Sequence, residues 1–334
     1  MSKIARSLVK LLPQSCLSGL ILFLSLGFAQ GQPRVREQPH SVKRNLNYAG
    51  GENPRQTLDL FVPDNRKEDE TFPLVVWIHG GGWRGGDKKS GHSPNRIPAL
   101  VSTGRYVGAT IGYRLSEEAQ WPAQIHDCKA AIRWLRARSK KFGINPEKVA
   151  VWGTSAGGHL ASMLGTSSGL KDLEGELGKH LRKSSRVQAV INGYGPSALL
   201  QMDDHPSKII HNAPYSPESK LIGAPIQKAK AKALQASPIT HVSPDDPPFL
   251  HFHGTHDQLV PFHQSEILHE ALLTKEVSSS LITIQGGGHR LDASYTLKYV
   301  LPFLDFHFYD LGMEIPDLNV PSLNGENSKN RIPR

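Results

Sequence analysis

Short apolar runs recur along the chain, and polar or amphipathic stretches separate them. The run Leu74–Ile78 (LVVWI) contains no polar position, which is typical of a strand buried on both faces. Residues 56–62 (QTLDLFV) alternate instead, as a half-buried strand does. Further apolar runs predict strands at 106–111, 149–152, 187–191, 249–252 and 281–284.

Helical periodicity fills several of the gaps between these runs. From Pro122 to about Phe142 the apolar residues fall on one stripe, and proline suits a first helical turn. Helices are also predicted at 159–164, 262–275 and 293–308. Because helices alternate with strands that are mostly apolar throughout, the pattern indicates an α/β fold with a mostly parallel sheet covered on both faces.

Three segments depart from this alternation. Residues 196–245 are rich in Pro, His, Ser and Lys and predict an insertion over the carboxyl edge of the sheet. Residues 32–45 are polar without a clear period and predict a linker, so the α/β domain is expected at 46–311. The tail, 312–334, is expected to be loosely ordered.

The first 31 residues have the pattern of a secretory signal peptide. Three basic residues precede an apolar run of about 12 residues, and Ala29-Gln30-Gly31 offers small residues for cleavage near Gly31-Gln32. The run is short for a membrane span, which needs ~20 residues. We therefore expect a secreted or periplasmic protein without stable membrane insertion after signal removal. A retained N-terminal membrane anchor is the alternative.

The composition limits the kinds of binding partner and cross-link that can be expected. The 334 residues carry a formal net charge of +9, but no basic stripe with interleaved aromatic residues is present, so nucleic-acid binding is not expected. Without the signal peptide, Cys128 is the only cysteine, so no intramolecular disulfide can form. The oligomeric state does not follow from the sequence.

One serine lies in a glycine-rich turn. Gly153-Thr154-Ser155-Ala156-Gly157 fits the G-x-S-x-G pattern between a predicted strand and a predicted helix. A strand that reverses sharply into a helix strains the serine, and side chains at Gly153 or Gly157 would clash there. The hydroxyl then projects from the carboxyl end of the sheet, where open α/β proteins bind ligands. An ordinary glycine-rich turn is the alternative reading.

A nucleophilic serine needs a base, and the base needs an orienting acid. Asp257 follows the apolar strand at 249–252, so it lies at the same edge as Ser155. The other acids considered precede that strand or lie in the insertion: Asp245, Asp246, Asp203 and Asp204. His289 follows the strand at 281–284 and a glycine run, and a near-neutral imidazole can move the serine proton. The alternative histidines fall in predicted helices: His263, His269 and His307.

The segment His79-Gly80-Gly81-Gly82-Trp83 follows the first buried strand at once and matches an HGGG-type oxyanion loop. Backbone N–H groups of Gly81 and Gly82, with that of Ala156, can donate to a developing oxyanion. His79 is expected to be structural. Trp83 can wall a pocket or simply pack.

Three histidines, an acid and a cysteine are further candidates for a functional role. A metal site at His251, His253 and His256 lacks a supporting carboxylate spacing, and no cofactor or metal is expected. Asp127 is interpreted as a structural pairing residue, and Cys128 as part of the core.

With the oxyanion loop, HGGGW, the elbow, GTSAG, the acid loop, HGTHDQLVP, and His289 in this order, the chain resembles the α/β-hydrolase superfamily. More narrowly, residues 45–310 are similar to bacterial feruloyl and acetylxylan esterases of the BD-FAE type, relatives of the hormone-sensitive-lipase-like carboxylesterases. The acid loop differs from the motif usual in those relatives, which favours the carbohydrate-esterase side. The prolyl-peptidase family shares this loop, but its members carry a large propeller domain.

The resemblance implies an eight-stranded sheet and hydrolysis of esters without a metal. It also implies that Ser155, Asp257 and His289 are catalytic, with Gly81, Gly82 and Ala156 at the oxyanion positions. The expected substrates are acetyl or feruloyl esters linked to polysaccharides, cleaved through an acyl-enzyme. Two alternatives stay open: a serine peptidase or amidase on the same scaffold, and a catalytically silent binding protein.

Overall fold

The computed structural model describes residues 38–64 and 66–322. The predicted signal peptide, with its cleavage site, and the end of the predicted tail lie outside these residues.

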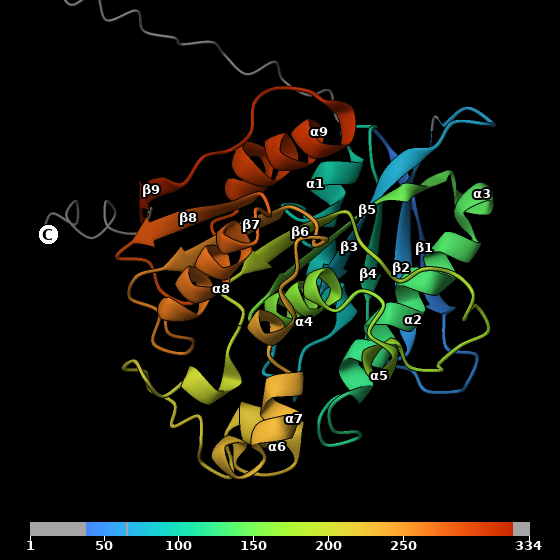
Figure 1. Cartoon of the computed structure of the whole chain (residues 1–334). Helices are drawn as coiled ribbons and strands as arrows, with labels where there is room; N and C mark the ends of the chain where they lie inside the picture. Colours follow the sequence, from blue (N-terminus) through green and yellow to red (C-terminus); the bar gives the residue numbers. More distant parts are fainter. Residues whose placement is uncertain (1–37, 65, 323–334) are drawn as a thin grey trace, which may run out of the picture. The chain divides into compact units, whose positions relative to one another are not determined.

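The described residues build a mixed sheet of nine strands in the order β1-β2-β4-β3-β5-β6-β7-β8-β9 (Figure 1). β2 runs antiparallel to both of its neighbours, β1 and β4, and all other pairs are parallel. The strands are β1 His40–Asn47, β2 Thr57–Pro63, β3 Phe72–Ile78, β4 Val107–Ile111, β5 Ile144–Thr154, β6 Ala189–Gly193, β7 Phe249–Gly254, β8 Ser279–Gln285 and β9 Leu318–Pro321.

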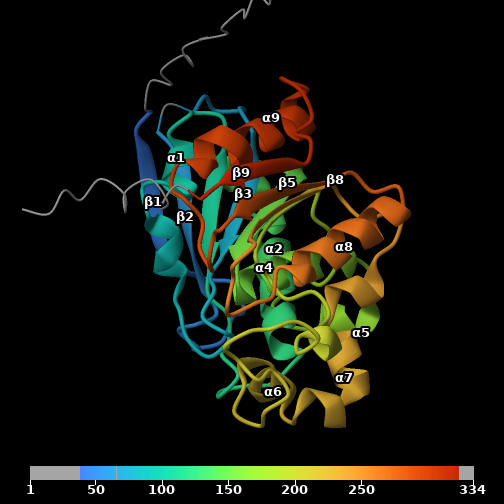
Figure 2. The same ribbon diagram turned by 90° about the vertical axis from the view of Figure 1, so that its left-hand side faces the viewer.

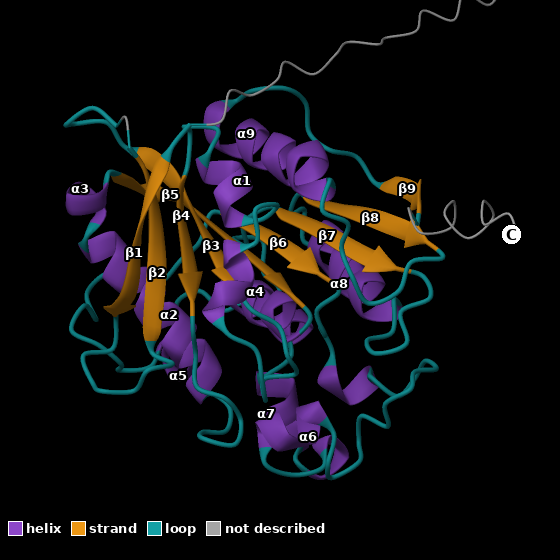
Figure 3. Cartoon of the chain, turned by 180° about the vertical axis from the view of Figure 1, so that it is seen from behind, coloured by secondary structure: helices purple, strands orange, loops and turns teal. Residues whose placement is uncertain are grey.

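Helices cover both faces of this sheet (Figures 1 and 3). Along β3, Leu74 and Val76 join the core under α2, α4 and α8, whereas Val75 and Trp77 join the core under α1 and α9. Every residue of β3 is therefore buried, which explains its continuous apolar run. The covering helices are α1 Ile97–Val101, α2 Ala123–Ala137, α3 Ser139–Phe142, α4 Ala156–Thr166, α5 Lys171–Glu174, α8 His263–Thr274 and α9 Leu301–Tyr309, with the short helices η1 Lys88–His92 and η5 Thr296–Val300.

The predicted insertion folds into short helical pieces, and its α6 and α7 lie together beyond the helices that cover the sheet (Figure 2). We call residues 196–245 the lobe. Its elements are η2 Leu199–Gln201, α6 Pro217–Ile222, η3 Ile226–Lys228, α7 Lys230–Gln235 and η4 Pro238–His241.

The predicted linker and tail both contain strands, so these two boundaries were wrong. Residues 40–45 belong to β1, which pairs with β2, and residues 318–321 form β9, which pairs with β8. Each strand lies at an edge of the sheet and leaves several side chains exposed. β1 is mostly polar, and β9 is only four residues long and ends in proline, so neither sequence has the pattern of a buried strand. β9 and β1 also bring the described sheet to nine strands where eight were expected.

The helix predicted from Pro122 to Phe142 is divided. α2 ends at Ala137, and Arg138 separates it from the single turn of α3. The helix predicted at 293–308 begins later, at Thr296, with one π-helical turn that continues into α9.

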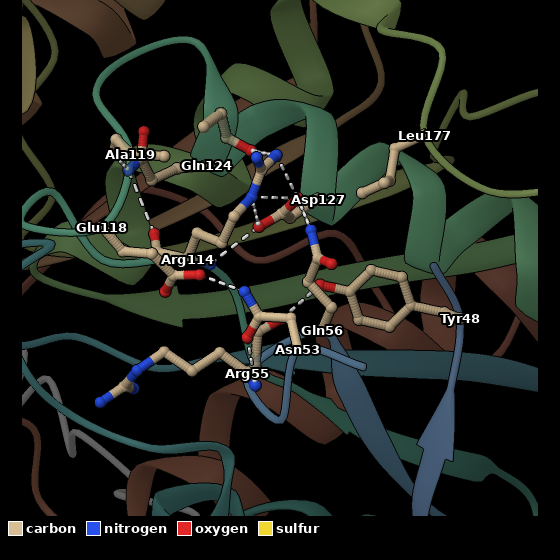
Figure 4. Close-up of polar contacts among 12 residues, drawn as sticks. Tyr48, Asn53, Arg55, Gln56, Arg114, Glu118, Ala119, Gln124, Asp127 and Leu177 are labelled. Atoms are coloured by element: carbon tan, nitrogen blue, oxygen red, sulfur yellow. Dashed lines mark hydrogen bonds and ion pairs between the residues drawn. The ribbon is translucent and has the colours of Figure 1, made fainter. Parts of the chain in front are cut away.

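Asp127 anchors α2 to the strands beside it, as the structural interpretation expected (Figure 4). Its fully buried carboxylate accepts hydrogen bonds from the Arg114 backbone N–H (2.8 Å), from the Arg114 guanidinium (2.7 Å from Nη2) and from Gln56 Nε2 (2.9 Å). Cys128 beside it is fully buried in the core.

None of the helices in the described part of the chain combines the length and the apolar character that crossing a bilayer requires.

Candidate active site

Ser155 lies between the last residue of β5 and the first residue of α4 in a strained backbone conformation, with φ 56° and ψ −126°. The turn is so tight that a Cβ at Gly153 would lie 2.0 Å from the Gly157 carbonyl oxygen. A Cβ at Gly157 would lie 2.1 Å from the carbonyl oxygen of Ile78. The Ser155 N–H donates to the Gly193 carbonyl (2.8 Å), which ties the turn to β6.

Three residues predicted from sequence come together here. Ser155 Oγ lies 2.9 Å from Nε2 of His289, and Nδ1 of the same ring lies 2.7 Å from Oδ2 of Asp257. Asp257 is buried, whereas the His289 side chain keeps 17% of its surface exposed. The three side chains therefore form one continuous hydrogen-bonded chain from the interior to an accessible hydroxyl.

The alternative acids bond elsewhere. Asp203 accepts the backbone N–H groups of His211 and Asn212 within the lobe. Asp246 accepts from Ser243 in the loop before β7.

The Asp257 carboxylate is held by several donors. Oδ1 accepts the backbone N–H groups of Leu259 (2.8 Å) and Val260 (3.0 Å), and Oδ2 also lies 3.2 Å from Nε2 of His253. Burial alone would raise the pKa of Asp257, but hydrogen bonds from His253 and His289 and the charge on these rings hold that pKa well below its usual range. The carboxylate is thus ionised at neutral pH and accepts the Nδ1–H of His289, which leaves Nε2 free to accept the Ser155 proton.

The sequence analysis did not assign His253 to this arrangement. Its Nε2 contacts both the Val260 carbonyl (3.0 Å) and Asp257, and Nδ1 lies 2.7 Å from Ser265 Oγ. Because a carbonyl can only accept, Nε2 carries a proton and is shared between the two oxygens. The available signal was the spacing of four residues between His253 and Asp257, at the point where β7 ends.

Tyr194 is a second residue that the sequence analysis missed. It has φ 43°, follows β6, and places its ring 4.4 Å from that of His289. This contact limits the orientations open to the imidazole.

The predicted oxyanion loop borders the same pocket. Gly81 has φ 111°, and its carbonyl accepts the N–H groups of Arg84 (3.1 Å) and Gly85 (3.0 Å), which closes a tight turn. Among the described residues, no hydrogen bond takes up the N–H groups of Gly81 and Gly82. Gly81, Gly82 and Ala156 all line the pocket with Ser155, as backbone donors to one oxygen must.

His79 at the start of this loop has the contacts of a structural residue. Its Nδ1 lies 2.8 Å from the Gly80 carbonyl, and its ring stacks on Tyr113 at 4.2 Å. Burial lowers the pKa of His79 to about 4, so the ring is neutral at physiological pH.

Trp83 packs and walls the pocket at once. Its Nε1 donates to Nδ1 of His159 (3.2 Å), and the indole is almost fully buried. His159 in turn donates from Nε2 to the Ala236 carbonyl (2.6 Å), which connects the oxyanion loop through α4 to the lobe.

The pocket has a volume of about 410 Å³. Apolar groups dominate its walls, and two side chains besides the hydrogen-bonded histidine carry a formal charge at neutral pH: Arg84 and Glu218. The lobe supplies Ile209, Pro217 and Glu218, so this segment shapes the pocket above Ser155.

Within the described residues, no group of three or more His, Cys, Asp or Glu side chains is arranged to hold a metal ion. Instead, Nδ1 of His251 accepts a hydrogen bond from Asn192 Nδ2 (3.2 Å), and the His251 ring stacks on Phe249.

The family model BD-FAE matches residues 58–272 of the chain. The chain belongs to the BD-FAE family. This span contains the oxyanion loop, the serine turn, the lobe and Asp257.

Relatives of this BD-FAE member carry esterase names. "Probable carboxylic ester hydrolase LipM" of Mycobacterium tuberculosis is 34% identical over 210 residues, which cover 62% of this chain and 46% of LipM. Esterase LipC of the same organism is 30% identical over 264 residues, which cover 77% of this chain and 62% of LipC. The chain thus spans about half the length of the curated relatives that it matches.

Among the solved structures that resemble this chain are proteins with esterase names. A "truncated form of carbohydrate esterase from gut microbiota" superposes with a TM-score of 0.74 at 31% identity, covering 82% of this chain and 97% of that one. A bifunctional GH43-CE protein of Bacteroides eggerthii gives a TM-score of 0.73 at 31% identity, covering 80% of this chain and 38% of its own. These neighbours and the observed sheet establish the α/β-hydrolase fold.

Proposed function

We propose that this protein is a serine carboxylesterase that removes acetyl or feruloyl groups from polysaccharides. The observation that carries the proposal is the continuous chain Asp257–His289–Ser155, which opens beside the unpaired amides of the glycine loop. The esterase names of the relatives support ester hydrolysis, and the carbohydrate-esterase neighbours support the substrate class.

The reaction proceeds in two steps. Nε2 of His289 takes the Ser155 proton while Oγ attacks the ester carbonyl carbon, and Asp257 stabilises the resulting imidazolium. The carbonyl oxygen becomes an oxyanion and accepts N–H donors from Gly81, Gly82 and Ala156. As the intermediate collapses, the bond to the alcohol breaks and His289 returns its proton to the leaving oxygen.

The acyl group is now an ester of Ser155. A water molecule gives a proton to His289 and attacks the acyl carbon through the same oxyanion geometry. The bond to Oγ then breaks, the acid leaves, and His289 reprotonates the serine. No group outside the site is consumed besides water.

The first experiment uses a fluorophosphonate probe and p-nitrophenyl acetate. We expect the probe to label the protein at Ser155, and Ser155→Ala to lose both labelling and hydrolysis. Ser294→Ala, at an exposed serine, serves as the control that retains both. Absence of labelling in the unmodified protein would favour a silent binding protein instead.

A second comparison separates the esterase from a peptidase on the same scaffold. We expect turnover of p-nitrophenyl acetate to exceed that of aminoacyl-p-nitroanilides, whereas the reverse order supports the peptidase. Acetylated xylan and methyl ferulate then distinguish the two proposed acyl groups by direct turnover.

We also propose export of the protein, because basic residues, an apolar run and small residues follow one another in the first 31 positions. Sequencing the N-terminus of protein recovered outside the cytoplasm should give a start near Gln32. An uncut N-terminus in the membrane fraction would favour the anchored alternative.

A further inference from the structure

The lobe contacts the rest of the protein on both sides of the pocket. On one side, Arg84 Nη1 after the oxyanion loop donates to the Tyr215 carbonyl (3.3 Å). On the other, the Lys208 N–H donates to the carbonyl of Gln258, next to the acid (2.7 Å). Between these two sides the lobe forms a wall of the pocket around Ser155, to which it contributes Ile209, Pro217 and Glu218.

Glu218 is the acidic residue of this wall. It has only 3% of its surface exposed and lines the pocket with Ser155, yet it takes no part in the hydrogen-bonded chain of the proposed mechanism. A carboxylate this enclosed requires partners, because burying an unpaired charge is costly.

One oxygen of Glu218 has such a partner within the lobe. Oε2 lies 3.0 Å from Nδ1 of His211, whose side chain is fully buried. The other ring nitrogen, Nε2, lies 3.1 Å from Ser207 Oγ, which already donates its own proton to the Ile209 carbonyl (2.7 Å). Nε2 must therefore donate to Ser207, which fixes the ring, and Nδ1 faces Oε2 at ion-pair distance without the geometry of a hydrogen bond.

The second carboxylate oxygen of Glu218, Oε1, has no hydrogen-bond donor among the described residues. No hydrogen bond joins Oε1 to any residue that the structure describes, whereas Oε2 is the enclosed oxygen of the pair. The side chain is held from behind by His211 and borders the cavity. Oε1 is thus a fixed acceptor without a donor.

We propose that Glu218 is a specificity-determining residue whose Oε1 accepts an O–H group of the ester substrate. This inference rests on the proposed esterase function. A hydroxyl group fits better than an ammonium group, because Arg84 lines the same pocket and His211 already faces the carboxylate. His211 is a positioning residue, since it acts on the substrate only through Glu218.

Two parts of the proposed substrates can supply this donor. A sugar hydroxyl next to the ester lies on the alcohol side, and the phenolic hydroxyl of a feruloyl group lies on the acyl side. Both present the same O–H chemistry, so substrate pairs that differ only in this proton distinguish them.

The experiment measures the ratio of kcat/KM for a hydroxyl-bearing substrate to that for its O-methylated analogue. One pair is an acetylated methyl xyloside with the neighbouring hydroxyl free or methylated. The other is methyl ferulate and methyl 3,4-dimethoxycinnamate. Because each ratio is taken within one variant, a general loss of folding or activity cancels.

In Glu218→Gln a neutral acceptor replaces a charged one, and we expect the ratio to fall about tenfold for one pair or both. A fall for the xyloside pair assigns the sugar hydroxyl, and a fall for the ferulate pair assigns the phenol. Glu270→Gln, at an exposed position on α8, is the matched control with an unchanged ratio.

His211→Leu removes the group that holds Glu218 and should lower the same ratio, while His211→Asn keeps a donor near the position of Nδ1 and should restore it. Ratios within twofold of the unmodified protein in Glu218→Gln, for both pairs, would overturn the proposal. Failure of the esterase function itself looks different, because the unmodified protein would then not hydrolyse p-nitrophenyl acetate at all.

Discussion

Ser155 occupies a backbone conformation that residues with a Cβ rarely adopt. The surrounding contacts enforce it: the Gly193 carbonyl holds the serine N–H, and the first turn of α4 passes within van der Waals distance of β3. Strain of this kind persists only where the packing around it is tight. It keeps Oγ at the end of β5, in reach of His289.

Gly157→Ala tests this packing. The added methyl group would lie 2.1 Å from the Ile78 carbonyl oxygen, which belongs to backbone and cannot move aside. We expect a loss of about 3 kcal/mol in the free energy of unfolding, measured by urea denaturation, and a fall in kcat on p-nitrophenyl acetate. Gly51→Ala is the control, because its methyl group would meet nothing within 4 Å.

Asp257→Asn tests the orientation of the imidazole. The amide cannot accept from His289 as the carboxylate does, and it favours the wrong tautomer, so kcat on p-nitrophenyl acetate should fall ~10³–10⁴-fold with little change in KM. Asp204→Asn, at an exposed acid of the lobe, should retain activity. Equal losses in the two variants would contradict the assignment of the acid.

Sequence motifs and apolar runs together locate functional residues that directly follow the carboxyl ends of strands. Ser155, Asp257 and His289 each follow a strand whose apolar run is visible, so their shared edge could be predicted from sequence. Glu218 could not, because it comes from a lobe of short helices without a period. Its partner His211 could not be predicted either, since no motif or periodicity in the sequence marks a single buried histidine.

At the scale of elements, α2 depends on one buried carboxylate. Asp127 joins this helix to the Arg114 loop after β4 and to Gln56 before β2 (Figure 4). In the ion pair between Arg114 and Asp127, the Asp127 side chain is fully buried, while the Arg114 side chain keeps 25% of its surface exposed. Three separate segments therefore rely on a single residue.

Asp127→Ala should lower the free energy of unfolding by about 3 kcal/mol, because it leaves buried donors without an acceptor. Urea denaturation provides the measurement. Asp69→Ala, at an exposed acid in the loop before β3, should change the same quantity by less than about 0.5 kcal/mol. A similar change in both variants would mean that the network adds nothing.

Central and edge strands differ in how far the sequence predicts them. β3 and β7 are buried along their whole length, and their apolar runs appear plainly. β1 buries no residue completely and shifts its register between Lys43 and Leu46, where Asn45 has φ 54°. Such a strand forms because it pairs with β2 through backbone hydrogen bonds, and the hydropathy of its sequence does not reveal this pairing.

At the scale of the whole molecule, several fully buried histidines make stability depend on pH. Burial, with smaller effects from His269 and His253, lowers the pKa of His251 to about 3 from an ordinary 6.5. Burial likewise lowers the pKa of His159 to about 4. As the pH falls below about 6.5, the unfolded chain takes up these protons while the folded protein does not, so the free energy of unfolding falls.

His251→Phe isolates one of these contributions. Between pH 7.5 and pH 5 the free energy of unfolding of the variant should fall by about 2 kcal/mol less than that of the unmodified protein. The comparison uses the difference between the two pH values, because loss of the Asn192 contact lowers stability at both. His205→Phe, at an exposed position, should show the full decrease.

The lobe is bound to the framework on opposite sides of the pocket: the Arg84 guanidinium donates to the Tyr215 carbonyl beside the glycine loop, and the Lys208 N–H donates to the Gln258 carbonyl beside the acid. Neither contact involves the reacting side chains. Residues 196–245 could therefore be exchanged as a cassette between members of the family, and such chimaeras should inherit the substrate choice of the donor while the recipient keeps its chemistry.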